Sequence, residues 1–274
     1  MNQSSFNKKN IAKNFSQAAK NYDESALVQK LAAKKLCELF TPLIKNEFKI
    51  IDIGSGTSAI CKNLTSSNGF IKKNCQLFEI DLSLQMLKTW PDKSSKHINS
   101  IVGDGENLPL KNESLDIIIS SFSLQWLKNF EKVFNDFYRI LKKDGILAFC
   151  LPNSYSLEEI KIASVKSGCN FYFSDLPKTA DLKSQLEQCG FKEQFIDSEI
   201  IESQFEGAVK ALKSLKKIGA NYSNQKNFIT KEQLRHFDCF NLENQSEDNK
   251  KFAISWNISY FIFHKSYTKA KTLI

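Results

Sequence analysis

A short apolar run that leads directly into a glycine-rich turn constrains this chain more than any other feature. Residues 48–53 read Phe-Lys-Ile-Ile-Asp-Ile, and Gly-Ser-Gly follows at 54–56. Glycine permits a tight turn and lets the backbone approach a ligand without a Cβ between them. In a doubly wound α/β fold this turn lies at the carboxyl end of the first strand, where ligands bind. The third glycine of a dinucleotide-binding GxGxxG turn is missing, because position 59 is Ala59.

The chain alternates apolar runs with helical patterns, which favours a parallel sheet covered on both faces. Further strands are predicted at Gln76–Ile80, Ile98–Val102, Leu115–Ser120, Ile146–Leu151, within Phe191–Phe205 and over Phe252–His264. Helices are predicted at Ile11–Tyr22, Val28–Leu39, Phe130–Leu141, Thr179–Gln188, Ala208–Ile218 and Thr230–Phe237. Gly145 is expected to end the helix over Phe130–Leu141, and Thr230 to cap the last helix.

Several classes of protein are disfavoured by composition and patterning. The longest apolar runs are far shorter than the roughly 18–20 residues that span a bilayer, and residues 1–21 show no apolar segment of a secretory signal. The seven cysteines are scattered without CxxC spacing, and the three histidines lie far apart. We therefore expect no membrane span, no metal site and no disulfide framework, and a reducing, cytoplasmic location.

The net charge of +8 comes almost entirely from lysine, since Arg139 and Arg235 are the only arginines. A lysine-rich solvated surface explains such a charge, and so does a polyanionic partner, either nucleic acid or an acidic protein. Lysine lacks the planar fork with which arginine reads phosphates and bases. The charge therefore does not favour nucleic acid.

Acidic residues stand at the ends of the second and third predicted strands. A carboxylate after the second strand can accept hydrogen bonds from both hydroxyls of a ribose; Asp81 is the first candidate and Glu79 the second. Asp81 and Ser83 can equally cap the following helix. After the third strand, Asp104 can accept from an adenine amino group while the backbone amide at 105 or 106 donates to the ring. The alternative is an ordinary polar turn.

Taken together, these motifs resemble the class I S-adenosylmethionine-dependent methyltransferases over residues 48–151. The resemblance implies a doubly wound, seven-stranded, mostly parallel sheet with an N-terminal helical lid and a helical insertion after strand five. It divides the chain into a lid (1–47), a cofactor-binding core (48–152), a substrate-side part with the last strands (153–265) and a frayed tail (266–274). It also implies S-adenosylmethionine as the cofactor, held by Asp52, Gly54, Gly56, Asp81, Leu82, Asp104, Gly105 and Ser121. A side chain at Gly54 would then project where the cofactor lies.

A closer resemblance, to the malonyl-[acyl-carrier-protein] O-methyltransferases of biotin synthesis, covers almost the whole chain. It rests on residues 11–22 with Gln29, on Leu124-Gln-Trp at 124–126, and on the helix ending at 212–221. Ser55 departs from the family, in which cysteine is more usual. The implied reaction methylates the free carboxylate of a malonyl thioester on acyl carrier protein, so that fatty-acid enzymes extend the neutral ester.

This reaction requires no proton transfer to a protein side chain, because a carboxylate is already ionised at neutral pH. No general base is needed; the acceptor must be aligned and water excluded. Expected catalytic residues are Tyr22, Lys213 and Lys217, and expected substrate contacts are Tyr22, Phe122, Trp126 and Lys210. Lys210, Lys213 and Lys217 share one face of a helix, where one can pair with the carboxylate and the others with the acidic carrier protein. Core packing for the aromatic residues and a solvated face for the lysines remain the alternatives.

Other functions on the same fold stay open at this point. They are methylation of another small molecule, a role like that of complex I assembly factors, and methylation of RNA. Residues 120–126 read Ser-Ser-Phe-Ser-Leu-Gln-Trp, without the Asn/Asp-Pro-Pro-Tyr motif of enzymes that methylate amino groups of bases or glutamine. Amino-group methylation of nucleic acid or protein is therefore disfavoured.

Overall fold

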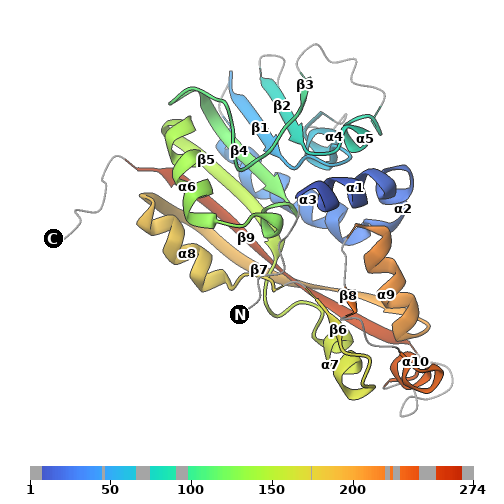
Figure 1. Cartoon of the computed structure of the whole chain (residues 1–274). Coiled ribbons are helices and arrows are strands. Elements are labelled where there is room, and N and C mark those ends of the chain that lie inside the picture. The colour runs from blue at the N-terminus through green and yellow to red at the C-terminus, as the bar shows by residue number, and fades with distance from the viewer. Residues whose placement is uncertain are drawn as a thin grey trace.

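The computed structural model describes residues 8–44, 47–65, 75–90, 98–173, 175–219, 223–224, 229–240 and 251–266. A seven-stranded sheet runs through this part of the chain, with helices on both faces (Figure 1). In the order in which they lie side by side, its strands are β3 (Ile98–Val102), β2 (Gln76–Asp81), β1 (Lys49–Ile53), β4 (Leu115–Ser121), β5 (Leu141–Pro152), β9 (Phe252–Lys265) and β7 (Phe191–Phe205). Neighbours from β3 to β5 are parallel, whereas β9 runs antiparallel to both β5 and β7. The predicted α/β fold is confirmed.

The helices follow the predicted alternation with the strands. They are α1 (Lys8–Ala18), α2 (Tyr22–Ser25), α3 (Leu27–Phe40), α4 (Ala59–Thr65), α5 (Leu84–Leu87), α6 (Phe130–Ile140), α7 (Glu158–Lys166), α8 (Thr179–Gln188), α9 (Ala208–Lys217) and α10 (Lys231–Asp238). Short 3-10 turns are η1 (Ala19–Asn21), η2 (Thr41–Leu43) and η3 (Leu124–Trp126), and the pair β6 (Phe171–Tyr172) and β8 (Ser223–Asn224) forms a second, small sheet. Among the described residues, no helix is both long and apolar enough to cross a membrane.

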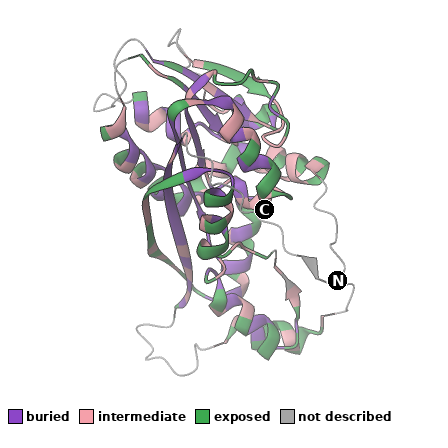
Figure 2. Ribbon diagram, turned by 90° about the vertical axis from the view of Figure 1, so that its left-hand side faces the viewer, coloured by how far each residue is buried: buried purple, intermediate pink, exposed green. Residues whose placement is uncertain are grey.

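Each face of the sheet is covered by its own apolar cluster. Ile50, Ile117 and Ala148 pack with α3 and α4 on one face, while Ile51 and Ile118 pack with α6 and α8 on the other. Successive residues of a strand point to opposite faces, so strands covered on both sides are apolar throughout. Figure 2 shows the central strands as mostly buried, with exposed residues mainly on the helices, the connecting loops and the edge strands.

Local signals predicted several boundaries correctly. Helix α8 spans Thr179–Gln188 as expected. Thr230 caps α10 through a reciprocal capping box, in which its hydroxyl accepts from the Gln233 amide and the Gln233 side chain accepts from the Thr230 amide. Gly219 follows α9 with a φ of +74°, the left-handed conformation that ends helices.

Two predictions about helix ends are wrong. Helix α6 ends at Ile140, and Gly145 lies inside β5 rather than after a helix. A Cβ at Gly145 would lie 2.9 Å from the carbonyl oxygen of Lys142 and 3.1 Å from that of Asp116, so backbone approach explains this glycine. The single helix predicted over Ile11–Tyr22 is also interrupted, because α1 ends at Ala18 and Tyr22 begins α2. Of the predicted frayed tail, only Ser266 lies within the described residues.

Candidate active site

The carboxyl ends of β1 to β4 border a cavity. All eight residues predicted to hold the cofactor line it, namely Asp52, Gly54, Gly56, Asp81, Leu82, Asp104, Gly105 and Ser121. Residues of α1, α2 and α3 line it as well, among them Phe15 and Tyr22. A cleft at this edge of a parallel sheet is the usual binding site in open α/β folds.

The glycine turn shapes one wall of the cavity. Gly54 and Gly56 have φ values of +68° and +54°, and the Gly54 amide donates to the Ile80 carbonyl at 2.8 Å. A Cβ at Gly54 would lie 2.3 Å from the Cβ of Ser123, whereas a Cβ at Gly56 would meet no atom within 4 Å. A side chain at Gly54 would therefore meet Ser123 first, and the expectation that it would enter the cofactor position stays a prediction. Gly54 makes room for Ser123, and Gly56 is the glycine that borders open space.

Asp52 is buried at the end of β1. The residue is 1% exposed, and neither of its carboxylate oxygens has a hydrogen-bond partner among the residues that the structure describes. Burial, followed by the charges of Glu79 and Asp81, raises the pKa of Asp52 well above its ordinary value. Buried polar atoms are nearly always hydrogen-bonded, so this carboxylate is available to a donor from a bound ligand.

Asp81 holds the glycine turn while facing the cavity. Its Oδ2 accepts from the Gly56 amide at 2.9 Å and its Oδ1 from the Ser83 amide at 2.8 Å. Burial raises the pKa of Asp81, and these two hydrogen bonds act against that rise. Ser83 caps α5, accepting from the Met86 amide. Glu79, the second candidate, is fully buried and accepts from the Ser100 hydroxyl instead of lining the cavity.

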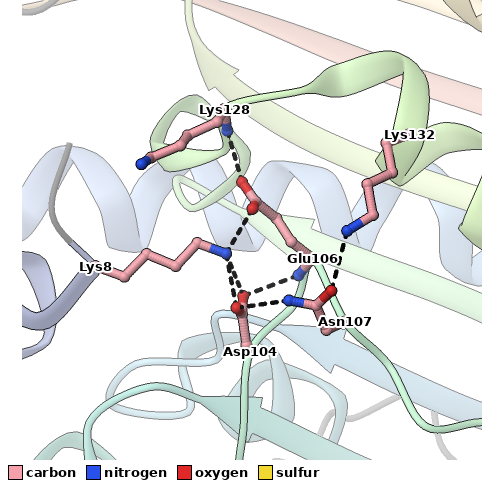
Figure 3. Close-up of polar contacts among 6 residues, drawn as sticks. All are labelled: Lys8, Asp104, Glu106, Asn107, Lys128 and Lys132. Carbon is pink, nitrogen blue, oxygen red and sulfur yellow. Dashed lines mark hydrogen bonds and ion pairs between the residues drawn. The ribbon is translucent and has the colours of Figure 1, made fainter. Parts of the chain in front are cut away.

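Asp104 is already occupied by a lysine from α1. Lys8 Nζ lies 2.9 and 2.6 Å from the two Asp104 oxygens and 2.5 Å from Glu106 Oε2 (Figure 3). The Glu106 amide and the Asn107 side chain also donate to Asp104. Burial alone would raise the pKa of Asp104, but Lys8 and these donors lower it below its ordinary value. All four acceptor positions of the carboxylate are thus filled, and an adenine amino group can bind only in exchange for one donor.

Polar links tie the N-terminal helices to the loop after each of three strands. Beyond β3 the link is Lys8 with Asp104. Beyond β2, the hydroxyls of Ser16 and Ser83 lie 2.8 Å apart. Beyond β1, Asp23 accepts from Thr57 at 2.5 Å and pairs with Lys62 at 3.0 Å. The N-terminal segment therefore lies across the cavity, where the predicted lid would be.

A second cavity adjoins the first. Five residues line both cavities, namely Phe15, Tyr22, Gln29, Phe122 and Trp126. The Phe122 backbone has a φ of +53°, and its ring packs against Trp256 with the centroids 5.9 Å apart. Tyr22 forms no hydrogen bond within the described residues; burial, then the charges of Asp81 and Asp23, raise its pKa. Its hydroxyl therefore stays protonated and can donate.

The structure does not bring the three predicted lysines to this site. Lys210, Lys213 and Lys217 are exposed on the outer face of α9, and none lines either cavity. Lys210 pairs with Glu206 on the surface. The lysine that does line the second cavity is Lys161 on α7. The sequence offered only a weak signal for it, a lysine between two isoleucines, a pattern common on helix surfaces.

The residues present fit S-adenosylmethionine. The unpartnered Asp52 carboxylate suits a cationic ligand with N–H donors, and the open side of Gly56 leaves room for the ligand. A carboxylate offers about four acceptor positions, so Asp81 can still accept from ribose hydroxyls. Fold and site together define a class I S-adenosylmethionine-dependent methyltransferase, and residues 51–149 match the family model described as a methyltransferase domain.

Relatives extend this similarity over most of the chain. The malonyl-[acyl-carrier protein] O-methyltransferase of Gallionella capsiferriformans (strain ES-2) is 28% identical over 229 residues, covering 81% of this chain and 78% of the relative. The protein of that name from Buchnera aphidicola subsp. Baizongia pistaciae is 27% identical over 263 residues, covering 94% and 98%. The resemblance to these methyltransferases expected from the sequence is confirmed.

Solved structures agree on the fold. The YcgJ protein of Bacillus subtilis superposes with a TM-score of 0.60 at 14% identity, covering 85% of this chain and 99% of that one. A putative methyltransferase from Bacillus halodurans superposes with a TM-score of 0.58 at 15% identity, covering 85% and 98%.

Proposed function

We propose that this chain methylates the free carboxylate of a malonyl thioester carried by acyl carrier protein. The observation that carries the proposal is the share of this chain that matches relatives named malonyl-[acyl-carrier protein] O-methyltransferase. The match covers 94% and 95% of this chain in two of them, and so includes the N-terminal helices and the α7–α9 region as well as the cofactor-binding core. Those outer elements build the second cavity.

The first cavity binds the cofactor, and the methyl acceptor enters through the adjoining second cavity. Bound S-adenosylmethionine supplies an electrophilic methyl group on a sulfonium sulfur. Asp52, the glycine turn and Asp81 border the cofactor cavity, while Tyr22, Phe122 and Trp126 stand where the two cavities meet. There the aromatic side chains exclude water from the reacting atoms, and Tyr22 donates a hydrogen bond to the acceptor.

A carboxylate acceptor needs no general base, and the lining of the second cavity fits such an acceptor. Among the residues that the structure describes, no histidine lines either cavity. A carboxylate with a pKa near 4 is ionised at neutral pH, so its oxygen already carries the electron pair that forms the new O–C bond. No proton has to be removed, and alignment with exclusion of water is sufficient.

The outer face of α9 suits the carrier protein. The buried face of this helix and its end contribute Leu215 and Ile218 to the second cavity, while Lys213 and Lys217 point outward and are exposed. An acidic carrier bound to these lysines would place its acyl arm beside the cavity. Charge reversal by Lys213→Glu or Lys217→Glu should raise KM for malonyl-carrier protein about tenfold, most strongly at low salt. Lys143 is exposed near the start of β5, and Lys143→Glu, the matched control, should change this KM little.

The test of the function uses purified protein, labelled S-adenosylmethionine and malonyl-carrier protein. We expect a base-labile methyl ester on the malonyl group, and no label on acetyl-carrier protein, which lacks the free carboxylate. Bound S-adenosylhomocysteine without transfer to any malonyl thioester would refute the proposal. The reducing, cytoplasmic location stays a prediction; it is supported by seven cysteines that are all free thiols.

A further inference from the structure

Lys161 is a charged residue in the largely apolar second cavity. Of the described residues that line this cavity, Lys161 alone is charged; most of the others are apolar, and Tyr22, Gln29 and Gln125 are polar but neutral. It comes from the first turns of α7, and its side chain is half-buried. A charge placed in such surroundings loses hydration, which is costly unless a partner of opposite charge replaces the water.

No carboxylate within the described part of the chain is that partner. Lys161 forms no ion pair there, although three acids are close enough to influence it. Glu159 is turned toward β9, where it accepts from the Ser255 amide at 3.1 Å and from the Ser255 hydroxyl at 2.5 Å. Glu158 and Asp175 are exposed, and none of the three lines the cavity. Desolvation of Lys161 outweighs these acids and lowers its pKa.

A purely structural role explains little of this arrangement. Lys161 Nζ donates to the carbonyl of Ser156 at 2.9 Å, which occupies one of three N–H donors. A neutral donor would satisfy that carbonyl at lower cost. Lys161 lines the second cavity together with Tyr22 and with Gln125, whose Oε1 has no hydrogen-bond partner among the described residues. This cavity thus offers an anion one positive charge and one hydroxyl.

We propose that Lys161 binds the carboxylate of the methyl acceptor and thereby selects the free acid over its ester. This inference rests on the proposed function, to which it adds the residue that recognises the acceptor. Methylation converts the anionic carboxylate into a neutral ester, so the ion pair with Lys161 exists before transfer and is lost after it. The same contact then favours substrate binding and product release.

The test compares Lys161→Met and Lys161→Arg with Lys166→Met, which changes an exposed lysine of the same helix. A charge-assisted hydrogen bond in a partly buried site is worth about 10- to 100-fold in affinity. We expect Lys161→Met to raise KM for malonyl-carrier protein by about that factor. Inhibition by the methyl-ester product and affinity for S-adenosylhomocysteine should both stay within about twofold, since neither ligand contacts this charge. Lys161→Arg should restore most of the affinity, and Lys166→Met should match the wild type.

Two results would overturn the role of Lys161. One is an unchanged KM in Lys161→Met; the other is an equal loss of affinity for the acid and the ester, which a structural defect would cause. If the wild type fails to methylate malonyl thioesters, a separate measurement tests the anion site alone. It measures the binding of free malonate to the complex of the protein with S-adenosylhomocysteine. Malonate binding that Lys161→Met abolishes would keep the anion site while the proposed function falls. No malonate binding by the wild type would remove both.

Discussion

Alanine at the two glycines of the turn after β1 should have different consequences: a larger loss of stability at Gly54 and a loss of ligand binding at Gly56. At Gly54 a Cβ would lie 2.3 Å from the Cβ of Ser123, far inside the roughly 3.5–4 Å of a normal carbon contact. Ser123 cannot retreat cheaply, because its hydroxyl donates to the Ile53 carbonyl at 2.7 Å and lies 2.6 Å from the Ser120 hydroxyl. At Gly56 a Cβ would meet nothing within 4 Å.

These distances set the expected magnitudes. An alanine held at positive φ costs about 1–2 kcal/mol, and this is the whole cost at Gly56. At Gly54 the two Ser123 hydrogen bonds add about 1 kcal/mol each, for a total of about 3–4 kcal/mol. In a chain of this size 1 kcal/mol lowers Tm by about 2–4 °C. Gly54→Ala should therefore unfold about 6–16 °C below the wild type, and Gly56→Ala about 2–8 °C below it.

Thermal unfolding without ligand and calorimetry with S-adenosylhomocysteine separate the two effects. Gly56→Ala should stay folded at 25 °C and bind the ligand at least about tenfold more weakly, because its methyl group enters space beside the cofactor. Gly54→Ala should show the larger loss of Tm. Equal Tm values for the two variants, or unimpaired binding by Gly56→Ala, would refute this account of the turn.

Three further substitutions test the site. Asp52→Asn should stabilise the ligand-free protein at pH 7 by about 1–3 kcal/mol, since the Asp52 carboxyl is buried without a hydrogen-bond partner among the described residues, and should weaken S-adenosylhomocysteine binding. Because folding raises the pKa of Asp52, ionisation of this group favours the unfolded state, and the difference in free energy of unfolding between variant and wild type should narrow as pH falls toward the ordinary range of an aspartate. Urea unfolding at pH 7 and pH 5 checks this. Lys8→Met removes a pair of ion contacts that are 26% exposed at Lys8, worth about 1 kcal/mol, and frees acceptor positions of Asp104 for the ligand. Stopped-flow release of S-adenosylhomocysteine should therefore slow about fivefold, and faster release would mean that Lys8 does not compete with the ligand. Tyr22→Phe should lower kcat on malonyl-carrier protein about tenfold while calorimetry finds cofactor affinity nearly unchanged; equal losses in both would make Tyr22 a structural residue.

The sequence alone determined the features that depend on neighbours along the chain. The run Phe48–Ile53 followed by two glycines specifies a buried strand and a turn whatever lies beyond it, because backbone conformation there follows from side-chain size. The periodicity of Thr179–Gln188 and the pairing of Thr230 with Gln233 specify helix boundaries in the same local way. These signals sufficed for the α/β fold and for a cavity lined by all eight predicted cofactor residues.

Only the tertiary structure decided which distant side chains meet. Gly54 is opposed by Ser123, Asp104 by Lys8 and the backbone of Gly145 by that of Asp116. Lysines at helical spacing on α9 share a face as predicted, yet that face points to solvent because Leu215 and its neighbours occupy the buried one. Lys161 instead lines the second cavity because of how α7 packs against β9. Helical spacing tells which residues share a face; packing between elements far apart in the chain decides where that face points.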